Sequence, residues 1–298
     1  KILTGMSDVA IVGGMESYST MTAKFPMSRP QYKLIPPYPI ALALTPNQER
    51  NIDMVSVSDK MAVKWNITRE EADAYACRSQ ERLAAAYKNG ITGDEIIPIA
   101  IPATRKTPEV IVDKDEFPRP GTTLEALAKL RAVNRDGVTT AGNASGRNDG
   151  AAFLLVMTAE KAKEYGYTPM AKWIGGAHYG VQEDYMGIGP AYSNLKALKQ
   201  LGMSVDDIDV VECNEAFAAQ NLSVIREMED QSGKKIDMER WNPNGGAIAI
   251  GHPNGASGAR ISMFCMKQLE KTGGRYGIIS SCCGGGLGTT AIIENLRR

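Results

Sequence analysis

The sequence contains few histidines and few cysteines, and each scarcity excludes a class of protein. Two histidines, His178 and His252, and no Cys-x-x-Cys pair leave too few ligands for a structural zinc site. Five cysteines among 298 residues form an odd and sparse set, unlike a disulfide framework. We therefore expect no metal and a reducing compartment, the cytoplasm.

The sequence also lacks an excess of charge and long apolar runs. Basic and acidic residues balance at 34 each, so no charge footprint for nucleic acid or an anionic membrane surface is present. No apolar run approaches the roughly 20 residues that a membrane-spanning helix needs. Gly-x-Gly-x-x-Gly, Gly-x-x-x-x-Gly-Lys-Ser/Thr and Gly-x-Ser-x-Gly are all absent, so dinucleotide, nucleoside triphosphate and serine-hydrolase sites are not supported.

What the sequence does contain is two glycine-rich segments, each with a reactive side chain. Residues 246–258 surround His252, and residues 282–288 begin with Cys282 and Cys283. Glycine lets backbone N–H groups approach a ligand and stabilise an oxyanion. A histidine and a thiol in such surroundings favour acyl-transfer chemistry, and the run of N–H donors after Cys282 is expected to favour its thiolate. The alternative is that both segments are ordinary turns, with a structural histidine and an inert buried cysteine.

A third segment, residues 210–218, has the same layout of an apolar strand followed by polar residues. Ligands of α/β proteins bind at the carboxyl ends of strands, so the three segments are expected to meet at one pocket. There Asn214 would hold a water or a carbonyl group. Asparagine is also a preferred N-cap, so Asn214 has a structural role as its alternative. The glycines and serine of a fourth segment, residues 139–150, are typical of a loop.

Helices and strands are expected to alternate from residue 151 onward, which predicts an α/β fold. Residues 8–14 and the apolar run 152–156 are predicted to be buried strands. Thr68 and Glu71 form a capping box that opens a helix ending at Asn89. Further helices are predicted at 122–130, 190–201, 214–228 and 256–271, and further strands at 96–101, 208–211, 278–280 and 290–293.

Six segments resemble thiolases, the acyl-CoA C-acetyltransferases, and they occur in the order of that family. They are Gly-Gly-Met-Glu-Ser at 13–17, Ala-Gly-Asn-Ala-Ser-Gly at 141–146, Met-Gly-Ile-Gly-Pro at 186–190, Asn-Glu-Ala-Phe-Ala at 214–218, Asn-Gly-Gly-Ala-Ile-Ala-Ile-Gly-His-Pro at 244–253 and Cys-Cys-Gly-Gly-Gly at 282–286. The resemblance implies a layered αβαβα fold. Residues 1–17 and 138–158 would belong to an incomplete N-terminal half, 18–137 to an inserted loop domain, and 159–298 to a complete C-terminal half.

The resemblance also implies catalytic roles. His252 would activate the nucleophilic cysteine and donate to the thioester oxyanion, and Asn214 would hold the water that completes that oxyanion site. Cys282, which the motif favours over Cys283, would act as the acid and base at the α-carbon, and Gly284 would give an N–H to a second oxyanion hole. The implied substrate-binding residues are Ser145, Ala141, Met186, Phe217 and Arg119.

One departure from the family bears on catalysis. Thiolases carry their nucleophilic cysteine in a Cys-Gly-Ser-Gly type segment upstream of Gly-Gly-Met-Glu-Ser, whereas no cysteine precedes Cys77 here. The sequence from Lys1 to Gly5 is also typical of the last turn of a helix. We therefore expect that the N-terminal portion with the nucleophile is missing and that this chain alone is inactive. The alternatives are a non-catalytic CoA-binding subunit and a decarboxylating ketoacyl synthase relative, which Cys282 in place of a second histidine disfavours.

The implied activity is reversible Claisen condensation of acyl-CoAs, or thiolysis of 3-ketoacyl-CoA, in fatty acid metabolism. Coenzyme A would be a substrate, and no separate cofactor is implied. The implied partners are acyl-CoA and CoA, further copies in a homodimer or homotetramer, and an N-terminal complementing fragment. Nucleic acid and membranes are not expected partners.

Overall fold

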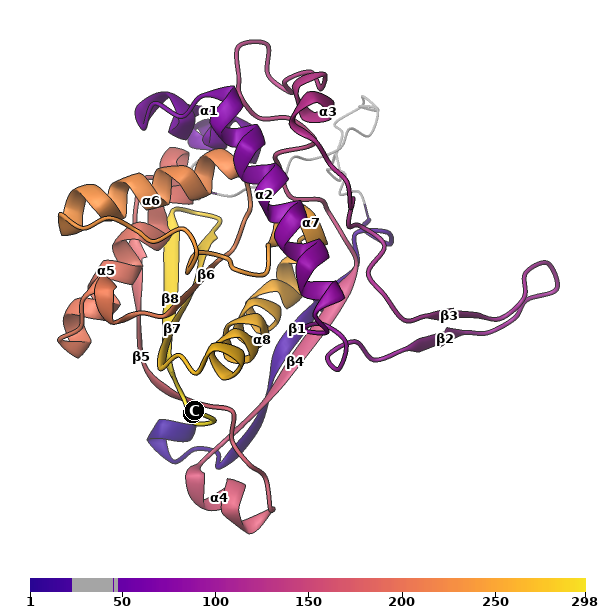
Figure 1. The fold of residues 1–298 in the computed structure, drawn as a ribbon, viewed down its shortest axis with the longest axis vertical. Coiled ribbons are helices and arrows are strands. Elements are labelled where there is room, and N and C mark those ends of the chain that lie inside the picture. Colours follow the sequence, from indigo (N-terminus) through magenta and orange to yellow (C-terminus); the bar gives the residue numbers. More distant parts are fainter. Residues whose placement is uncertain (23–44, 46–47) are drawn as a thin grey trace, which may run out of the picture.

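A four-stranded sheet lies at the centre of the computed structural model, which describes residues 1–22, 45 and 48–298 (Figure 1). The strand order is β5 (Ala171–Gly180), β8 (Leu287–Asn295), β7 (Tyr276–Cys283) and β6 (Val210–Cys213). β6 runs parallel to β7, while β8 is antiparallel to both β5 and β7. The sheet is buried by helices on both faces.

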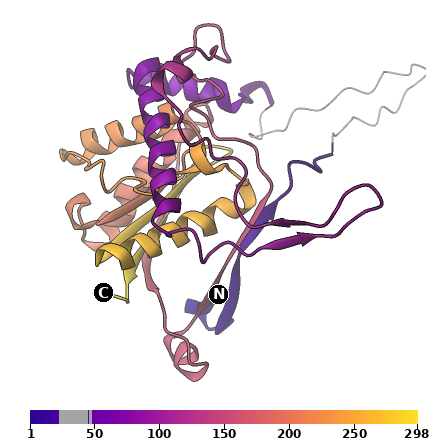
Figure 2. The ribbon, with the colours of Figure 1, turned by 45° about the vertical axis from the view of Figure 1, so that its right-hand side comes forward.

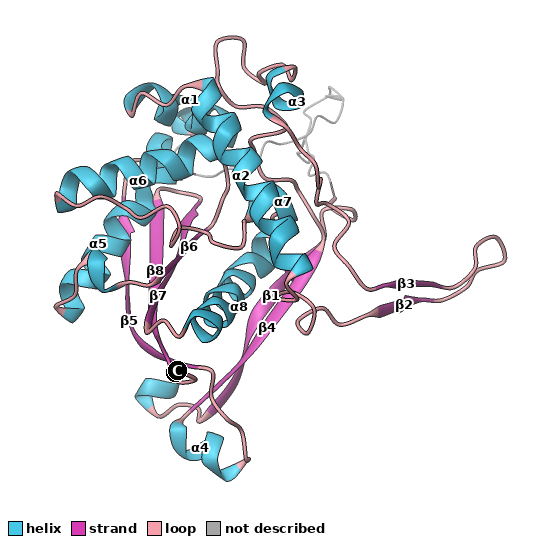
Figure 3. Cartoon of the chain, viewed as in Figure 1, coloured by secondary structure: helices cyan, strands magenta, loops and turns pink. Residues whose placement is uncertain are grey.

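Helices with an apolar side cover both faces of the central sheet and form the layers of the fold (Figures 1 and 3). α5 (Gly189–Leu201) and α6 (Ala218–Ser232) lie against one face of the sheet. α8 (Asn254–Thr272) covers the other face and is preceded by the short α7 (Ala247–Ile250). Beyond α8 lies a second, two-stranded sheet. The layered α/β fold class predicted from the sequence is confirmed.

The second sheet is an antiparallel ribbon of β1 (Val9–Glu16) and β4 (Gly150–Met157). Its inner face packs on α8, but its outer face is open. Ile11 lies directly opposite Leu155, and both remain exposed, at 77% and 48%. Met15 and Phe153 on the same face are 76% and 54% exposed. The prediction that these apolar runs are strands is confirmed, but the prediction that they are buried is wrong, because among the described residues each has one neighbouring strand and one covered face.

The segment between these two strands is helical and holds a projecting hairpin. α1 (Met54–Lys64), α2 (Arg69–Lys88) and α3 (Leu124–Ala128) pack beside α6 and α7. The capping box of Thr68 and Glu71 is present as predicted, and the helix ends at Asn89. The hairpin of β2 (Ile99–Ile101) and β3 (Val110–Val112) projects from the body (Figure 2).

The remaining short elements are α4 (Ala159–Glu164) and the 3-10 turns Ile2–Thr4, Gln48–Arg50, Glu183–Ile188 and Val205–Asp207. The helix predicted at 214–228 begins at Ala218 with Phe217 as its N-cap, so the N-cap alternative for Asn214 is wrong. Part of the predicted insertion 18–137 lies outside the described residues, and the division into two halves and an insertion stays a prediction. No helix in the described part of the chain combines the length and apolarity needed to cross a bilayer.

Candidate active site

His252 lies in the short link between α7 and α8, and the preceding glycine makes that link possible. Gly251 has a φ of 100°, a region that L side chains rarely adopt, and a Cβ there would overlap the Asn148 side chain. The close approach lets the backbone N–H of His252 donate to the Gly146 carbonyl at 3.2 Å and to Asn148 Oδ1 at 3.3 Å. His252 is thereby held against the loop that carries Ser145.

Both ring nitrogens of His252 have side-chain partners. Nδ1 lies 2.6 Å from Ser257 Oγ, and Nε2 lies 3.3 Å from Asn214 Nδ2. Burial and, to a smaller extent, the nearby Arg260 guanidinium lower the pKa of His252 to about 4. The imidazole is therefore neutral at pH 7 and is free to accept a proton.

The low pKa of His252 gives a prediction for NMR. We expect the ring of His252 to titrate with a midpoint near 4, against a reference of 6.5, in histidine-labelled protein. Because the folded pKa lies below the unfolded one, the stability that this neutral ring contributes is present above pH 6.5 and is lost as the pH falls towards 4. The spectrum holds one other histidine, His178, which His178→Gln identifies. A midpoint near 6.5 for His252 would contradict the buried, neutral state.

Cys282 lies near the end of β7, at the same edge of the sheet as Asn214. Ser280 is paired with the last residue of β6, and its carbonyl accepts the Asn214 N–H at 2.9 Å. Cys282 follows two residues later, beyond the end of β6. The structure thus places Asn214 beside His252, and Cys282 at the same end of the sheet as Asn214, while their catalytic roles stay predictions.

The ionisation predicted for Cys282 is wrong for this state. Neighbouring N–H groups were expected to favour the thiolate, but desolvation of the sulfur raises the pKa of Cys282 to about 12, with a further contribution from Cys283. Burial also raises the pKa of Cys283. Cys282 is consequently a neutral thiol, ready to donate a proton rather than to attack.

Gly284 opens the three-residue turn that joins β7 to β8. Gly285 and Gly286 both have positive φ, 88° and 86°, so side chains are disfavoured there. The Gly286 carbonyl accepts the N–H of Val181 at 2.7 Å, which fixes the turn against the end of β5. The turn is compact enough for its backbone to lie beside Cys282.

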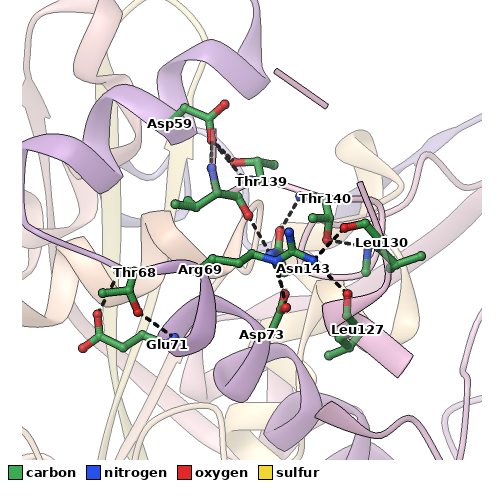
Figure 4. Close-up of polar contacts among 12 residues, drawn as sticks. Asp59, Thr68, Arg69, Glu71, Asp73, Leu127, Leu130, Thr139, Thr140 and Asn143 are labelled. Carbon is green, nitrogen blue, oxygen red and sulfur yellow. Dashed lines mark hydrogen bonds and ion pairs between the residues drawn. The ribbon is translucent and has the colours of Figure 1, made fainter. Parts of the chain in front are cut away.

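The loop that leads to Ser145 is fixed by two carboxylates of the inserted segment (Figure 4). Asp59 on α1 accepts the N–H groups of Val138 and Thr139, each at 3.0 Å. Asp73 on α2 accepts Asn143 Nδ2 at 2.8 Å and also pairs with Arg69. These contacts hold the loop rigidly between the helices and the site.

The same loop meets the Asn214 segment. Ser145 N–H donates to the Ala216 carbonyl at 3.0 Å, and Ala144 and Phe217 form an isolated β-bridge. Arg119 lies near the loop as well. Its guanidinium is 5.7 Å from the Phe117 ring, and that ring lies so close to Gly146 that a Cβ there would overlap it.

Two of the predicted substrate-binding residues, Ala141 and Met186, differ in how exposed they are. Ala141 is exposed on the loop, whereas Met186 is 6% exposed and packs in the main hydrophobic core. The structure therefore brings Ser145, Phe217 and Arg119 to the site loop and leaves Met186 as a core residue in this state.

Sequence reasoning missed Ser257, Asn148 and Glu215, which support the site rather than form it. Ser257 and Asn148 contact His252 directly, and Glu215 is a buried acceptor beside Asn214. A serine in the first turn of the helix after His252 was a signal that the sequence offered. The partners of Glu215 are scattered along the chain, so no local pattern marks it.

Two family models together match nearly the whole chain. Thiolase, N-terminal domain, matches residues 1–160, and Thiolase, C-terminal domain, matches residues 167–295. The chain belongs to the thiolase family. The resemblance inferred from the six sequence motifs is therefore confirmed.

Named relatives and solved structures agree with this family. Acetyl-CoA acetyltransferase of Allochromatium vinosum is 43% identical over 99% of this chain and 74% of its own length. Beta-ketoadipyl-CoA thiolase of Pseudomonas putida is 42% identical over the same shares. The structure of Syntrophomonas wolfei acetyl-CoA acetyltransferase superposes with a TM-score of 0.91 at 36% identity, over 99% of this chain and 74% of that one. Human mitochondrial 3-ketoacyl-CoA thiolase gives 0.87 at 38% identity, over 99% and 73%.

Proposed function

We propose that this thiolase transfers acyl groups between CoA thioesters, by Claisen condensation of two acyl-CoAs or by thiolysis of a 3-ketoacyl-CoA. The observation that carries the proposal is the contact of His252 with Asn214, which follows β6 at the end of the sheet where the parallel strand β7 carries Cys282. Relatives named acetyl-CoA acetyltransferase and beta-ketoadipyl-CoA thiolase support it.

His252 serves the covalent half of the reaction. Its neutral Nε2 accepts the proton of a nucleophilic thiol, and the resulting thiolate attacks the substrate carbonyl carbon. The protonated Nε2 then donates to the oxyanion that forms there, beside the Asn214 amide. In thiolysis, collapse of this intermediate breaks the C–C bond, and the electron pair leaves on the α-carbon of acetyl-CoA.

Cys282 serves the carbanion half. Its sulfur is protonated at rest, so it donates its proton to the departing α-carbon in thiolysis. In the reverse direction the Cys282 thiolate removes that proton before the new C–C bond forms. The backbone N–H of Gly284 lies in the adjoining turn, where it would stabilise the enolate oxygen.

The nucleophilic thiol must come from outside these five cysteines. Cys77 lies in α2, 8% exposed, with its sulfur 3.3 Å from the Thr122 carbonyl, and Cys213 and Cys265 are fully buried. We propose that a segment carrying the nucleophilic cysteine, in this protein or in a partner, covers the open outer face of the β1–β4 ribbon. Such a segment would cover the exposed Ile11, Met15 and Phe153.

Complementation tests both proposals. We expect no thiolysis of acetoacetyl-CoA by the chain alone, and activity when it is mixed with the portion of the Allochromatium vinosum relative to which this chain does not align. Leu155→Asp should weaken the complementation, because it places a charge on the docking face. Ile97→Asp, at an 82% exposed residue next to the β2–β3 hairpin, is the matched control.

The other outcomes decide against catalysis. A mixture that binds CoA and assembles, yet shows no turnover, would identify a non-catalytic CoA-binding subunit.

Coenzyme A is the proposed substrate, which the human 3-ketoacyl-CoA thiolase structure in complex with CoA supports. Ser145, Ala141, Phe217 and Arg119 are its proposed contacts, and Met186 is proposed with them despite its burial in the ligand-free chain. A cytoplasmic homo-oligomer acting in fatty acid metabolism is also proposed.

A further inference from the structure

Ser257 lies in the first turn of α8, five residues after His252, and it is 3% exposed. Its Oγ lies 2.6 Å from His252 Nδ1 and 3.0 Å from the Pro253 carbonyl oxygen. The Ser257 hydroxyl carries one proton, so it can donate to only one of these two groups. The position of that proton determines which ring nitrogen of His252 is protonated.

The Pro253 carbonyl can only accept, so the contact at 3.0 Å is made only if the Ser257 hydroxyl donates to it. The Ser257 oxygen is then left with lone pairs towards the ring. It accepts a hydrogen bond from His252 Nδ1, which must carry the proton of the neutral imidazole.

The opposite side of the ring points to the same tautomer. Asn214 Nδ2 is a donor with no lone pair to offer, and it lies 3.3 Å from His252 Nε2. With the Asn214 amide in this orientation, Nε2 is the acceptor nitrogen. Asn214 Oδ1 is buried without a hydrogen-bond partner in the described part of the chain, so it remains available to a donor from a substrate or a water.

We propose that Ser257 is a positioning residue that holds His252 in the tautomer protonated on Nδ1, so that Nε2 is ready to accept the proton of the attacking thiol. The catalytic value of this arrangement rests on the proposed function, but the tautomer itself does not. Because Ser257 Oγ accepts from Nδ1–H both before and after Nε2 is protonated, the ring need not turn during the reaction. That is the preorganisation that proton transfer requires.

The tautomer can be measured directly on the ligand-free chain. Long-range ¹H–¹⁵N correlation spectra of histidine-labelled protein at pH 7 should show His252 protonated on Nδ1. In Ser257→Ala the ratio of the two tautomers should shift about fivefold towards Nε2–H, the effect of losing one hydrogen bond. Ser257→Thr keeps the hydroxyl and should restore the wild-type pattern.

Ser262→Ala is the matched control. Ser262 lies on the same helix and donates to the Gly258 carbonyl at 2.7 Å, the same i to i−4 bond that Ser257 makes, but it is exposed. It should leave the His252 signals unchanged. Thermal unfolding of each variant separates a change of tautomer from a loss of folding.

Two results would overturn the inference: a wild-type ring protonated on Nε2, or a Ser257→Ala spectrum identical to the wild type. If the tautomer is as stated but the complemented protein has no turnover, the proposed function fails and this inference stands. In an active complex, Ser257→Ala should lower kcat about fivefold with KM unchanged, and Ser257→Thr should recover it.

Discussion

Replacing Cys282 with serine is expected to lower kcat for thiolysis by the complemented protein about 10³-fold, the contribution of a well-placed general acid. A serine hydroxyl fills the same place but is a much weaker acid than a thiol, so it cannot protonate the departing carbanion effectively. Initial rates of acetoacetyl-CoA cleavage measure the effect. The prediction concerns the chemical step, so KM should change little.

Cys283→Ser is the matched control, because the two thiols are adjacent and both belong to β7. Their side chains point to opposite faces of the strand, so only one can face Asn214 and His252. Cys283→Ser should keep kcat within about threefold of the wild type. If Cys283→Ser proves the inactive variant and Cys282→Ser the active one, the assignment within the pair is reversed.

Among the substitutions named in the Results and Discussion, Glu215→Ala is expected to lower the free energy of unfolding the most. Glu215 is 1% exposed, and its carboxylate accepts four hydrogen bonds. The donors are Tyr75 Oη at 3.1 Å, Ser79 Oγ at 2.6 Å, Asn242 Nδ2 at 3.0 Å and the Ile248 N–H at 3.3 Å. They come from α2, from the loop between α6 and α7 and from α7, so one side chain joins three parts of the site's support.

Without the Glu215 carboxylate the Ser79 hydroxyl and the Ile248 N–H lose their acceptor inside the protein, at a cost of about 1–3 kcal/mol each where no water replaces it. Tyr75 and Asn242 each lose one hydrogen bond but keep another acceptor, Asn221 Oδ1 and the Cys213 carbonyl. We expect a loss of about 4 kcal/mol in the free energy of unfolding, or about 10 °C in Tm by circular dichroism. Glu239→Ala is the control, because Glu239 is 86% exposed and forms one surface ion pair with Arg82. It should change stability by about 1 kcal/mol or less. A Tm drop below about 3 °C for Glu215→Ala would show that the network is not structural.

The parts of the fold that local chemistry determines were predictable from the sequence. The capping box at Thr68 sets the start of α2, and the helix predicted at 190–201 matches α5 to within one residue. The exposure of Ile11 and Phe153 was not predictable in the same way. Their apolar, β-favouring runs specify strands, but how many neighbours a strand has depends on segments distant in the sequence.

The residues of the site also divide into those that local sequence patterns predict and those whose contacts are distant in the sequence. His252 and Asn214 were found because glycine-rich and strand-end patterns are local. The support from Glu215 was not found, since its donors lie up to 140 positions away. The ionisation of Cys282 was predicted in the wrong direction, because neighbouring N–H groups are visible in a sequence and desolvation is not.

The open face of the β1–β4 ribbon has a consequence for how the chain behaves during synthesis. Within the described part of the chain this ribbon has an exposed aliphatic face and no strand paired to its outer edges, so it can recruit a further strand from a chain that supplies one. Capture by a dedicated partner is first order in that partner, whereas pairing between identical ribbons is second order in this chain. The outcome is therefore a kinetic competition that depends on expression level. A modest excess of partner, or simple dilution, favours assembly, and overproduction of this chain alone favours inclusion bodies.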